Sequence, residues 1–379
     1  MCRALFILLC ASSSWAAEPA RVPARDEVVE TQLLPRAVKQ SVQRLGRAKP
    51  SAGKPEGTLL PAQRIDHARR LIQDGRASGD PRTLGYAESV LAGLAETGTT
   101  GVEVLVLRAT IEQSRHRFDA ARSLLDRALE QAPAHVQARL TRATIAHVRG
   151  DLDAARTDCG ALRDTAPTVA VICGAIGDSL SGKNVAALKT LEGVTDPSLR
   201  GWALSLAGEV HEQQGAPDAA ERAYTASLAL GADLYTTVAL ADALIAQQRW
   251  PQAEALLMPM PATDAVLLRR WRVARAQQRD AGALQTLLTD RFAAAQTRGE
   301  LLHAREAALF ALDQADIAAA LKLARQNWND QREPADLRIL ALAASAANDA
   351  GALAEVRAWL ERTGLRDARV ELALKPGMR

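Results

Sequence analysis

A 34-residue repeat is the feature that most limits what this chain of 379 residues can fold into. Residues of the same kind recur at that spacing: Ala109 and Ala143, Ala121 and Ala155, Phe118 and Leu152, and Pro133 and Pro167. A period of this length holds two amphipathic helices and a tight turn. One such unit cannot bury its apolar stripe alone, so the repeat predicts a row of stacked helical pairs.

The first clear unit shows how the sequence builds one pair. Apolar residues recur at helical spacing from Ala121 to Leu129, which predicts a helix over 118–131 after an earlier helix over 102–114. Ala109 and Ala121 are small because the two helices cross closely there, and Pro133 cannot continue the second helix. Repeated close crossings also account for the composition, in which Ala and Leu are abundant and only 3% of residues are aromatic.

These small, large and proline positions resemble the tetratricopeptide repeat. In that family a small residue lies within the first helix, a large apolar residue opens the second helix, small residues follow, and a proline closes the unit. In the first unit these positions are Ala109, Phe118, Ala121, Ala128 and Pro133. In the next unit they are Ala143, Leu152, Ala155, Leu162 and Pro167, where Leu162 departs from the small residue expected.

The resemblance extends from about Leu59 to the C-terminus. It implies an all-α fold, a right-handed α-solenoid of about eight to nine helix-turn-helix units. The prolines between Met258 and Pro261 predict a break that separates an N-terminal array over 59–258 from a degenerate C-terminal array over 259–379. The glycines and proline between Gly75 and Pro81 predict a long first turn.

The N-terminus has the pattern of an export signal over residues 1–16. Arg3 precedes an apolar run, and small residues follow it, which predicts cleavage after Ala16. Cys10 leaves a lipoprotein alternative, although Leu9 is large where that peptidase requires a small residue. No later segment holds about 18 uninterrupted apolar residues. We therefore expect a mature chain without a transmembrane segment, in the periplasm or secreted.

Residues 17–58 are predicted to form a disordered, basic, proline-containing linker. Between residues 18 and 57 stand eight basic and five acidic residues, and this net charge of +3 equals that of the whole chain. The folded body is therefore nearly neutral. Together with export, this argues against a nucleic acid partner.

Candidate chemistry is sparse. The six histidines lack metal-binding spacing, and no Gly-rich phosphate loop precedes a helix, so the sequence predicts no metal site, no cofactor and no enzymatic activity. Gly177 to Ser181 approaches a nucleophile motif but lacks its last glycine. Cys159 and Cys173 fall on helices of adjacent units, where they are candidates for a disulfide in an oxidising compartment; two buried free thiols are the alternative.

The resemblance places the partner-binding surface on the first helix of each pair, which lines the concave groove of such arrays. In the early units it assigns Thr110, Gln113, Thr144 and His147. Further along it assigns an acidic, partly aromatic stretch of Trp202, Glu209, Glu212, Tyr235 and Asp242. Arg272 and Arg275 then belong to a basic stripe with Arg269 and Arg279, for which a solvated helix face is the simpler interpretation.

The resemblance implies a non-catalytic protein-interaction scaffold or adaptor in the bacterial cell envelope, which binds an extended segment of a protein or peptide partner. The residues leave the identity of that partner open. Two alternatives also stay open: a regulatory or accessory subunit of an envelope enzyme or export complex, and a glycan-binding module. Trp202 and Tyr235 are the aromatic residues that could stack on a glycan.

Overall fold

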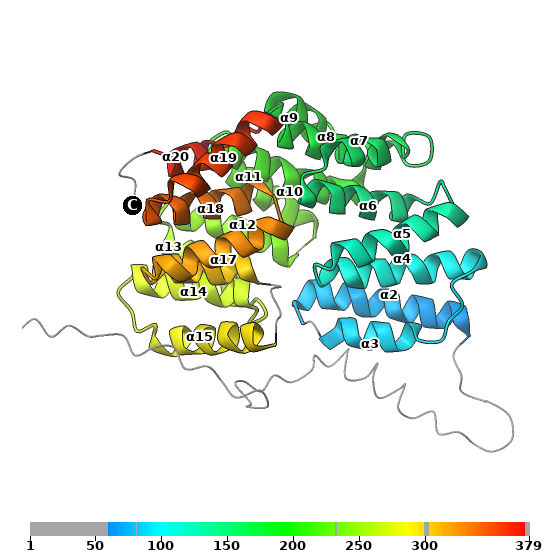
Figure 1. Ribbon diagram of the computed structural model, residues 1–379, viewed down its shortest axis with the longest axis horizontal. Helices are drawn as coiled ribbons and strands as arrows, with labels where there is room; N and C mark the ends of the chain where they lie inside the picture. The colour runs from blue at the N-terminus through cyan, green and yellow to red at the C-terminus, as the bar shows by residue number, and fades with distance from the viewer. Residues whose placement is uncertain (1–59, 81, 232, 299–302, 376–379) are drawn as a thin grey trace, which may run out of the picture.

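The computed structural model describes residues 60–80, 82–231, 233–298 and 303–375 (Figure 1). Within these ranges the chain forms nine helix pairs and a short final helix, without strands. The prediction of an all-α solenoid with about eight to nine units is confirmed. The predicted signal peptide over 1–16 and the whole of the predicted linker over 17–58 lie outside the described residues.

Each pair consists of a first helix and a second helix joined by a short turn. The first helices are α2 (Pro61–Ser78), α4 (Gly98–Ser114), α6 (Val136–Arg149), α8 (Pro167–Leu180), α10 (Pro197–Gln213), α12 (Leu234–Ala246), α14 (Asp264–Ala276), α16 (Ala304–Asp313) and α18 (Pro334–Ala347). The second helices are α3 (Arg82–Leu91), α5 (Phe118–Gln131), α7 (Leu152–Gly160), α9 (Asn184–Glu192), α11 (Pro217–Leu230), α13 (Trp250–Leu257), α15 (Gly282–Thr297), α17 (Ile317–Asp330) and α19 (Ala350–Thr363). The short helix α20 (Ala368–Ala373) follows the ninth pair.

Local sequence sets the ends of these helices. Asp151, Asp316 and Asp349 each accept a hydrogen bond from the backbone N–H three residues ahead, which satisfies a donor that the first helical turn leaves unpaired. Gly150 ends α6 with a φ of 74°, a conformation that favours glycine. The helix predicted over 118–131 is α5, whereas α4 begins at Gly98, ahead of the predicted start at residue 102.

Small residues pack where helices cross, as the repeat predicts. Ala109, Ala121, Ala143 and Ala155 have no exposed surface. A Cβ atom at Gly208 of α10 would lie 2.3 Å from the ring of Tyr224 on α11, so a larger residue has no room there. The close approach of first and second helices therefore depends on side-chain size at a few repeated positions.

The first turn is shorter than predicted. Helix α2 continues through Gly75 to Ser78, because the missing side chain at Gly75 leaves space for Thr83 at the start of α3. At the other irregular place, α13 is short and ends at Leu257, just before Pro259 and Pro261. The division of the chain into two arrays at this point stays a prediction.

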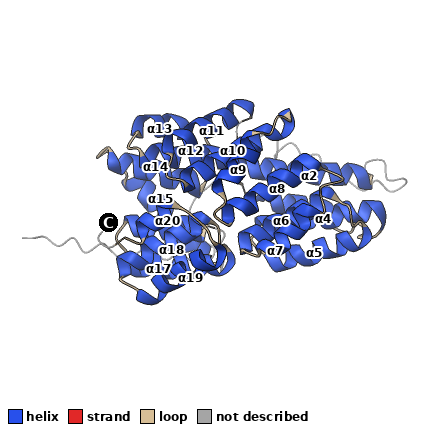
Figure 2. Ribbon diagram, turned by 90° about the horizontal axis from the view of Figure 1, so that it is seen from above, coloured by secondary structure: helices blue, strands red, loops and turns tan. Residues whose placement is uncertain are grey.

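The solenoid winds far enough for its last units to pack on earlier ones (Figure 1 and Figure 2). Helix α20 contacts α10, and α12 contacts α2. The Asn184 side chain donates a hydrogen bond of 3.1 Å to the carbonyl of Arg366, and the Arg332 N–H donates one of 2.7 Å to the carbonyl of Val148. Distant parts of the sequence are thereby brought together. In the described part of the chain, no helix has the length and apolar character needed to cross a bilayer.

Candidate functional site

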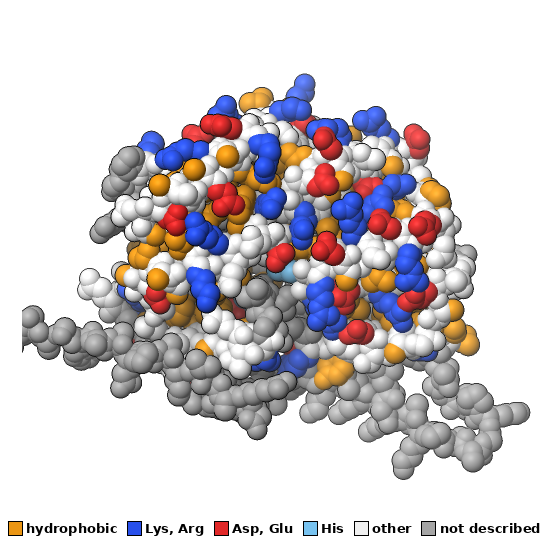
Figure 3. Space-filling view, in the orientation of Figure 1, with side chains coloured by type: hydrophobic (Ala, Val, Ile, Leu, Met, Phe, Trp, Pro, Cys, Tyr) orange, Lys and Arg blue, Asp and Glu red, His pale blue; other side chains and the backbone are white. Residues whose placement is uncertain are grey.

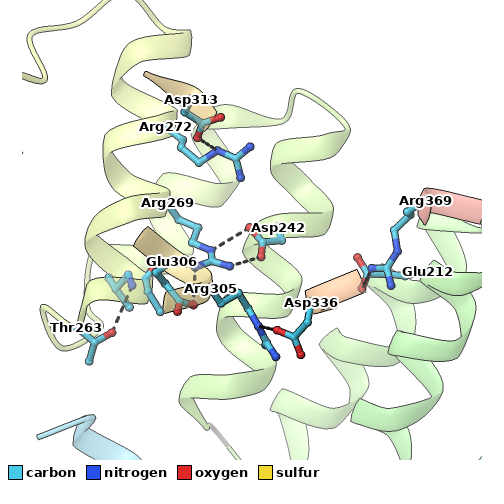
Figure 4. Close-up of polar contacts among 12 residues, drawn as sticks. Glu212, Asp242, Thr263, Arg269, Arg272, Arg305, Glu306, Asp313, Asp336 and Arg369 are labelled. Atoms are coloured by element: carbon cyan, nitrogen blue, oxygen red, sulfur yellow. Dashed lines mark hydrogen bonds and ion pairs between the residues drawn. The ribbon is translucent and has the colours of Figure 1, made fainter. Parts of the chain in front are cut away.

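Charged side chains from the later first helices and from α20 lie close together (Figure 4). These side chains form ion pairs between helices, and we call them the central charge cluster: Glu212, Asp242, Arg269, Arg305, Glu306, Asp336 and Arg369. On the face seen in Figure 3, by contrast, acidic and basic side chains are interspersed over the surface. The cluster is therefore the candidate binding surface.

Arg269 of α14 joins three first helices. Its guanidinium donates to both carboxylate oxygens of Asp242 on α12, over 3.0 and 2.6 Å, and lies 3.5 Å from Glu306 on α16. Arg269 is only 6% exposed. Burial alone would raise the pKa values of Asp242 and Glu306, but the neighbouring charge of Arg269 holds both below their ordinary values. Both carboxylates are therefore ionised beside a buried cation.

Arg305 of α16 forms a second buried pair. Its Nε atom donates to Asp336 on α18 over 2.6 Å, and its Nη2 atom donates to Glu333 over 2.5 Å. The Asp336 carboxylate also accepts a hydrogen bond of 2.7 Å from Asn327. Burial raises the pKa of Asp336, while Arg305 opposes the shift. The pair thus fixes α16 against α18.

Arg369 connects the last helix to the middle of the solenoid. Its Nη1 atom donates to Glu212 of α10 over 2.7 Å, and the Tyr224 hydroxyl donates to the same carboxylate oxygen over 3.0 Å. Next to this pair, the Tyr235 hydroxyl donates to Glu209 over 3.0 Å. Burial raises the pKa of Glu209 to about 8, and the charges of Glu333 and Glu212 add to that rise. Glu209 is therefore a carboxyl group that holds a proton more readily than a free one.

Two groups beside the cluster remain open to a ligand. Tyr235 is 56% exposed even though its hydroxyl contacts Glu209. Arg338 of α18 is exposed, and among the described residues it forms no ion pair or hydrogen bond. Neighbouring protein atoms partly desolvate the Arg338 guanidinium and lower its pKa; the positive charge of Arg369 lowers it further, while the charges of Asp242 and Glu212 oppose the shift. An additional anion beside Arg338 would relieve this repulsion.

Comparison with known proteins concerns the fold. No protein-family model matches the chain, and no curated protein does either. Among solved structures, the chain is similar to the APC/C hetero-tetramer Cut9–Hcn1, with a TM-score of 0.52 and 15% identity, over 83% of this chain and 66% of that one. The fold is that of a tetratricopeptide-like solenoid.

Two further solved structures are similar at lower scores. The Rap protein complexed with competence and sporulation factor has a TM-score of 0.47 and 12% identity, over 89% of this chain and 93% of that one. The P58(IPK) TPR domain has a TM-score of 0.25 and 13% identity, over 83% and 96%. This chain spans slightly less than two thirds of the Cut9–Hcn1 chain that it matches.

In the early units of the solenoid, the prediction of outward groove residues is wrong for Thr110 and His147. Each is 5% exposed, because neighbouring first helices α4, α6 and α8 pack against one another. The Thr110 hydroxyl donates to the carbonyl of Val106, and burial lowers the pKa of His147 to about 4. Gln113 and Thr144 are half-buried, and the Thr144 hydroxyl donates to the carbonyl of Leu140.

The later predicted residues divide into two groups. Glu209, Glu212, Tyr235 and Asp242 do come together at or beside the central charge cluster. Trp202, by contrast, is half-buried and packs against the apolar core between α8 and α11. The acidic residues and Tyr235 therefore lie together as predicted, whereas Trp202 is part of the apolar core.

The basic stripe predicted on α14 and the turn after it is not an open binding surface, because its arginines already have partners. Arg272 pairs with Asp313 at 2.9 Å, and Arg279 pairs with Glu254 at 2.7 Å. Arg275 stacks on Trp271 at 4.7 Å from the ring centroid and donates to the Asp313 carbonyl. Four members of the cluster, and Arg338 beside it, were not identified from the sequence. The available signal was a charged residue within an otherwise apolar helix. The four members are Arg305, Glu306, Asp336 and Arg369.

The sulfur atoms of Cys159 on α7 and Cys173 on α8 are bonded to each other. Both residues are buried and pack against Ala143 of α6. The bond therefore ties the third pair of the solenoid to the fourth, away from the central charge cluster.

Proposed function

We propose that this protein is a non-catalytic scaffold or adaptor of the bacterial cell envelope, whose central charge cluster binds an extended segment of a protein partner. The observation that carries the proposal is the pair of open groups, Tyr235 and Arg338, beside a cluster whose other side chains are paired. Concave surfaces lined by first helices are the binding surfaces of helical solenoids. A fixed, charged surface of this kind supplies orientation and specificity for a partner.

The charges indicate what the bound segment would carry. Among the described residues Arg338 forms no ion pair, which leaves its guanidinium open to a carboxylate of the segment. Glu209 lies near Glu333, and its raised pKa means that a cationic side chain beside it would favour its ionised form. Tyr235 provides an exposed ring between polar groups. We therefore propose a segment that holds both an acidic and a basic residue.

The alternative of a regulatory or accessory subunit in an envelope enzyme or export complex uses the same surface and differs in the partner. The glycan alternative has less support, because stacking on a sugar would rest on Tyr235 while Trp202 packs in the core. A periplasmic or secreted location stays part of the proposal. It rests on the predicted signal peptide, and a bonded cysteine pair suits an oxidising compartment.

Replacing Arg338 by glutamate tests the surface. We expect Arg338→Glu to weaken capture of the partner by about tenfold or more, because the reversal turns a favourable contact into repulsion. The measurement is the partner's binding curve at low salt. Arg357→Glu on α19 is the matched control, since Arg357 is also exposed. Equal weakening by both variants, or none by Arg338→Glu, would contradict the proposed surface.

A further inference from the structure

A second charged site lies on the second helices of the eighth and ninth pairs, whose first helices carry part of the central charge cluster. There α17 and α19 enclose a cavity of about 170 Å³, whose walls are Trp328, Arg332, Glu355, Ala358, Trp359 and Arg362. The cavity sits at the junction where the ninth pair packs on the end of α6, because Arg332 donates its N–H to the Val148 carbonyl. None of its walls belongs to the central charge cluster.

Two tryptophans form a rigid base for this cavity. Trp328 and Trp359 are 3% and 6% exposed, and their rings meet edge to face at 5.0 Å. A Cβ atom at Gly150 would lie 2.2 Å from the Trp359 ring, so the glycine lets the indole fit against the end of α6. The ring is therefore held from two sides, and groups that stack on it are held in place as well.

Two guanidinium groups face that one ring. The Arg362 group lies 4.5 Å from the centroid of Trp359, and the Arg332 group lies 5.3 Å from it. In the described part of the chain, neither has a carboxylate within ion-pair distance. Arg149 is nearby, and its own partner Asp330 is 3.6 Å away. Burial lowers the pKa of Arg332, and the charges of Arg362 and Arg149 add to that shift.

We propose that this cavity binds a small oxyanion of the phosphate class. Guanidinium groups donate planar pairs of hydrogen bonds to phosphate oxygens, and stacking on an indole holds them in a fixed direction. The anion neutralises two cations that lie near the same ring and otherwise repel each other. Glu355 is the acidic residue in the wall, and it is exposed on the solvent side. Its negative charge weakens binding without closing the cavity.

The test is titration of the full chain with inorganic phosphate in a chloride buffer of constant ionic strength. Binding is followed by tryptophan fluorescence and by equilibrium dialysis. We expect saturable binding that Arg362→Gln weakens by about tenfold or more, since a charge-assisted hydrogen-bond donor is lost. Glu355→Gln should tighten binding. Arg357→Gln, which removes an exposed charge from the same helix, should leave it unchanged.

A second arm distinguishes the source of the phosphate group. Vesicles of phosphatidylglycerol are compared with vesicles of phosphatidylcholine in a sedimentation assay. Binding of phosphatidylglycerol that is lost in Arg362→Gln assigns the site to a lipid headgroup, and binding of inorganic phosphate alone assigns it to a soluble ligand. The proposal is overturned if neither probe binds saturably, or if Arg362→Gln and Arg357→Gln bind as the unchanged chain does.

Discussion

Replacing Arg305 by alanine is expected to lower the free energy of unfolding by about 3–5 kcal/mol, the cost of removing one partner from a buried ion pair. Asp336 is 1% exposed, and Arg305 is its cationic partner at 2.6 Å. Without Arg305, its carboxylate stays buried with the hydrogen bond from Asn327 but no positive charge. Urea unfolding at neutral pH measures the loss.

The pH dependence of this loss has a definite sign. Burial raises the pKa of Asp336 in the folded protein, and loss of Arg305 removes a group that opposes the rise. A carboxyl group whose folded pKa is raised favours the folded state at low pH, and this contribution disappears as the pH rises through the folded pKa. The cost of Arg305→Ala should therefore shrink as the pH falls below neutral.

Two variants serve as controls for Arg305→Ala. Arg325→Ala removes an exposed arginine that pairs with Asp349 at 3.1 Å, and such surface pairs contribute at most about 1 kcal/mol. Adding Asp336→Asn to Arg305→Ala removes the buried charge and should recover part of the stability. If Arg305→Ala costs no more than Arg325→Ala, the central charge cluster does not hold α16 to α18.

The second large effect is expected from the disulfide. Replacing Cys159 and Cys173 by alanine should lower the free energy of unfolding by about 3 kcal/mol, because the bond closes a short loop between residues 14 apart and restricts the unfolded chain. Thermal unfolding of the oxidised protein and of the double variant measures the difference.

Adding reductant shows whether the loss of stability comes from the missing disulfide or from the changed packing of the side chains. It should destabilise the unchanged protein towards the level of the double variant and should leave the double variant as it was. A titration that finds both thiols free in protein isolated directly from cells would mean that the bond does not form in the cell.

The repeat made much of the fold predictable. Pro133, Ala121 and the apolar stripe from Ala121 to Leu129 are local signals, and they place α5 at its observed bounds. The alanines at the crossings were predictable for the same reason, since each packs against the helix next to it in the sequence. Cys159 and Cys173 lie on successive helices, so their proximity also followed from the order of the units.

The site was predictable only in part, because it depends on how tightly the solenoid winds. A single unit does not show which side of its first helix the next first helix covers, and Thr110 and His147 are buried for that reason. The pair of Arg369 with Glu212 joins residues 157 positions apart. The fit of Trp359 against Gly150 likewise depends on the later units returning to the earlier ones. No repeat pattern carries that information.

The most direct test of the proposed function is crosslinking from the central surface in intact cells. Tyr235 is replaced by a photoreactive phenylalanine derivative, and Val185, an exposed residue of the outer helix α9, is replaced in the same way as the control. We expect a light-dependent adduct with one protein from position 235 and none of that mass from position 185. No adduct from position 235, or the same adducts from both positions, would contradict the claim that the central surface binds a protein partner.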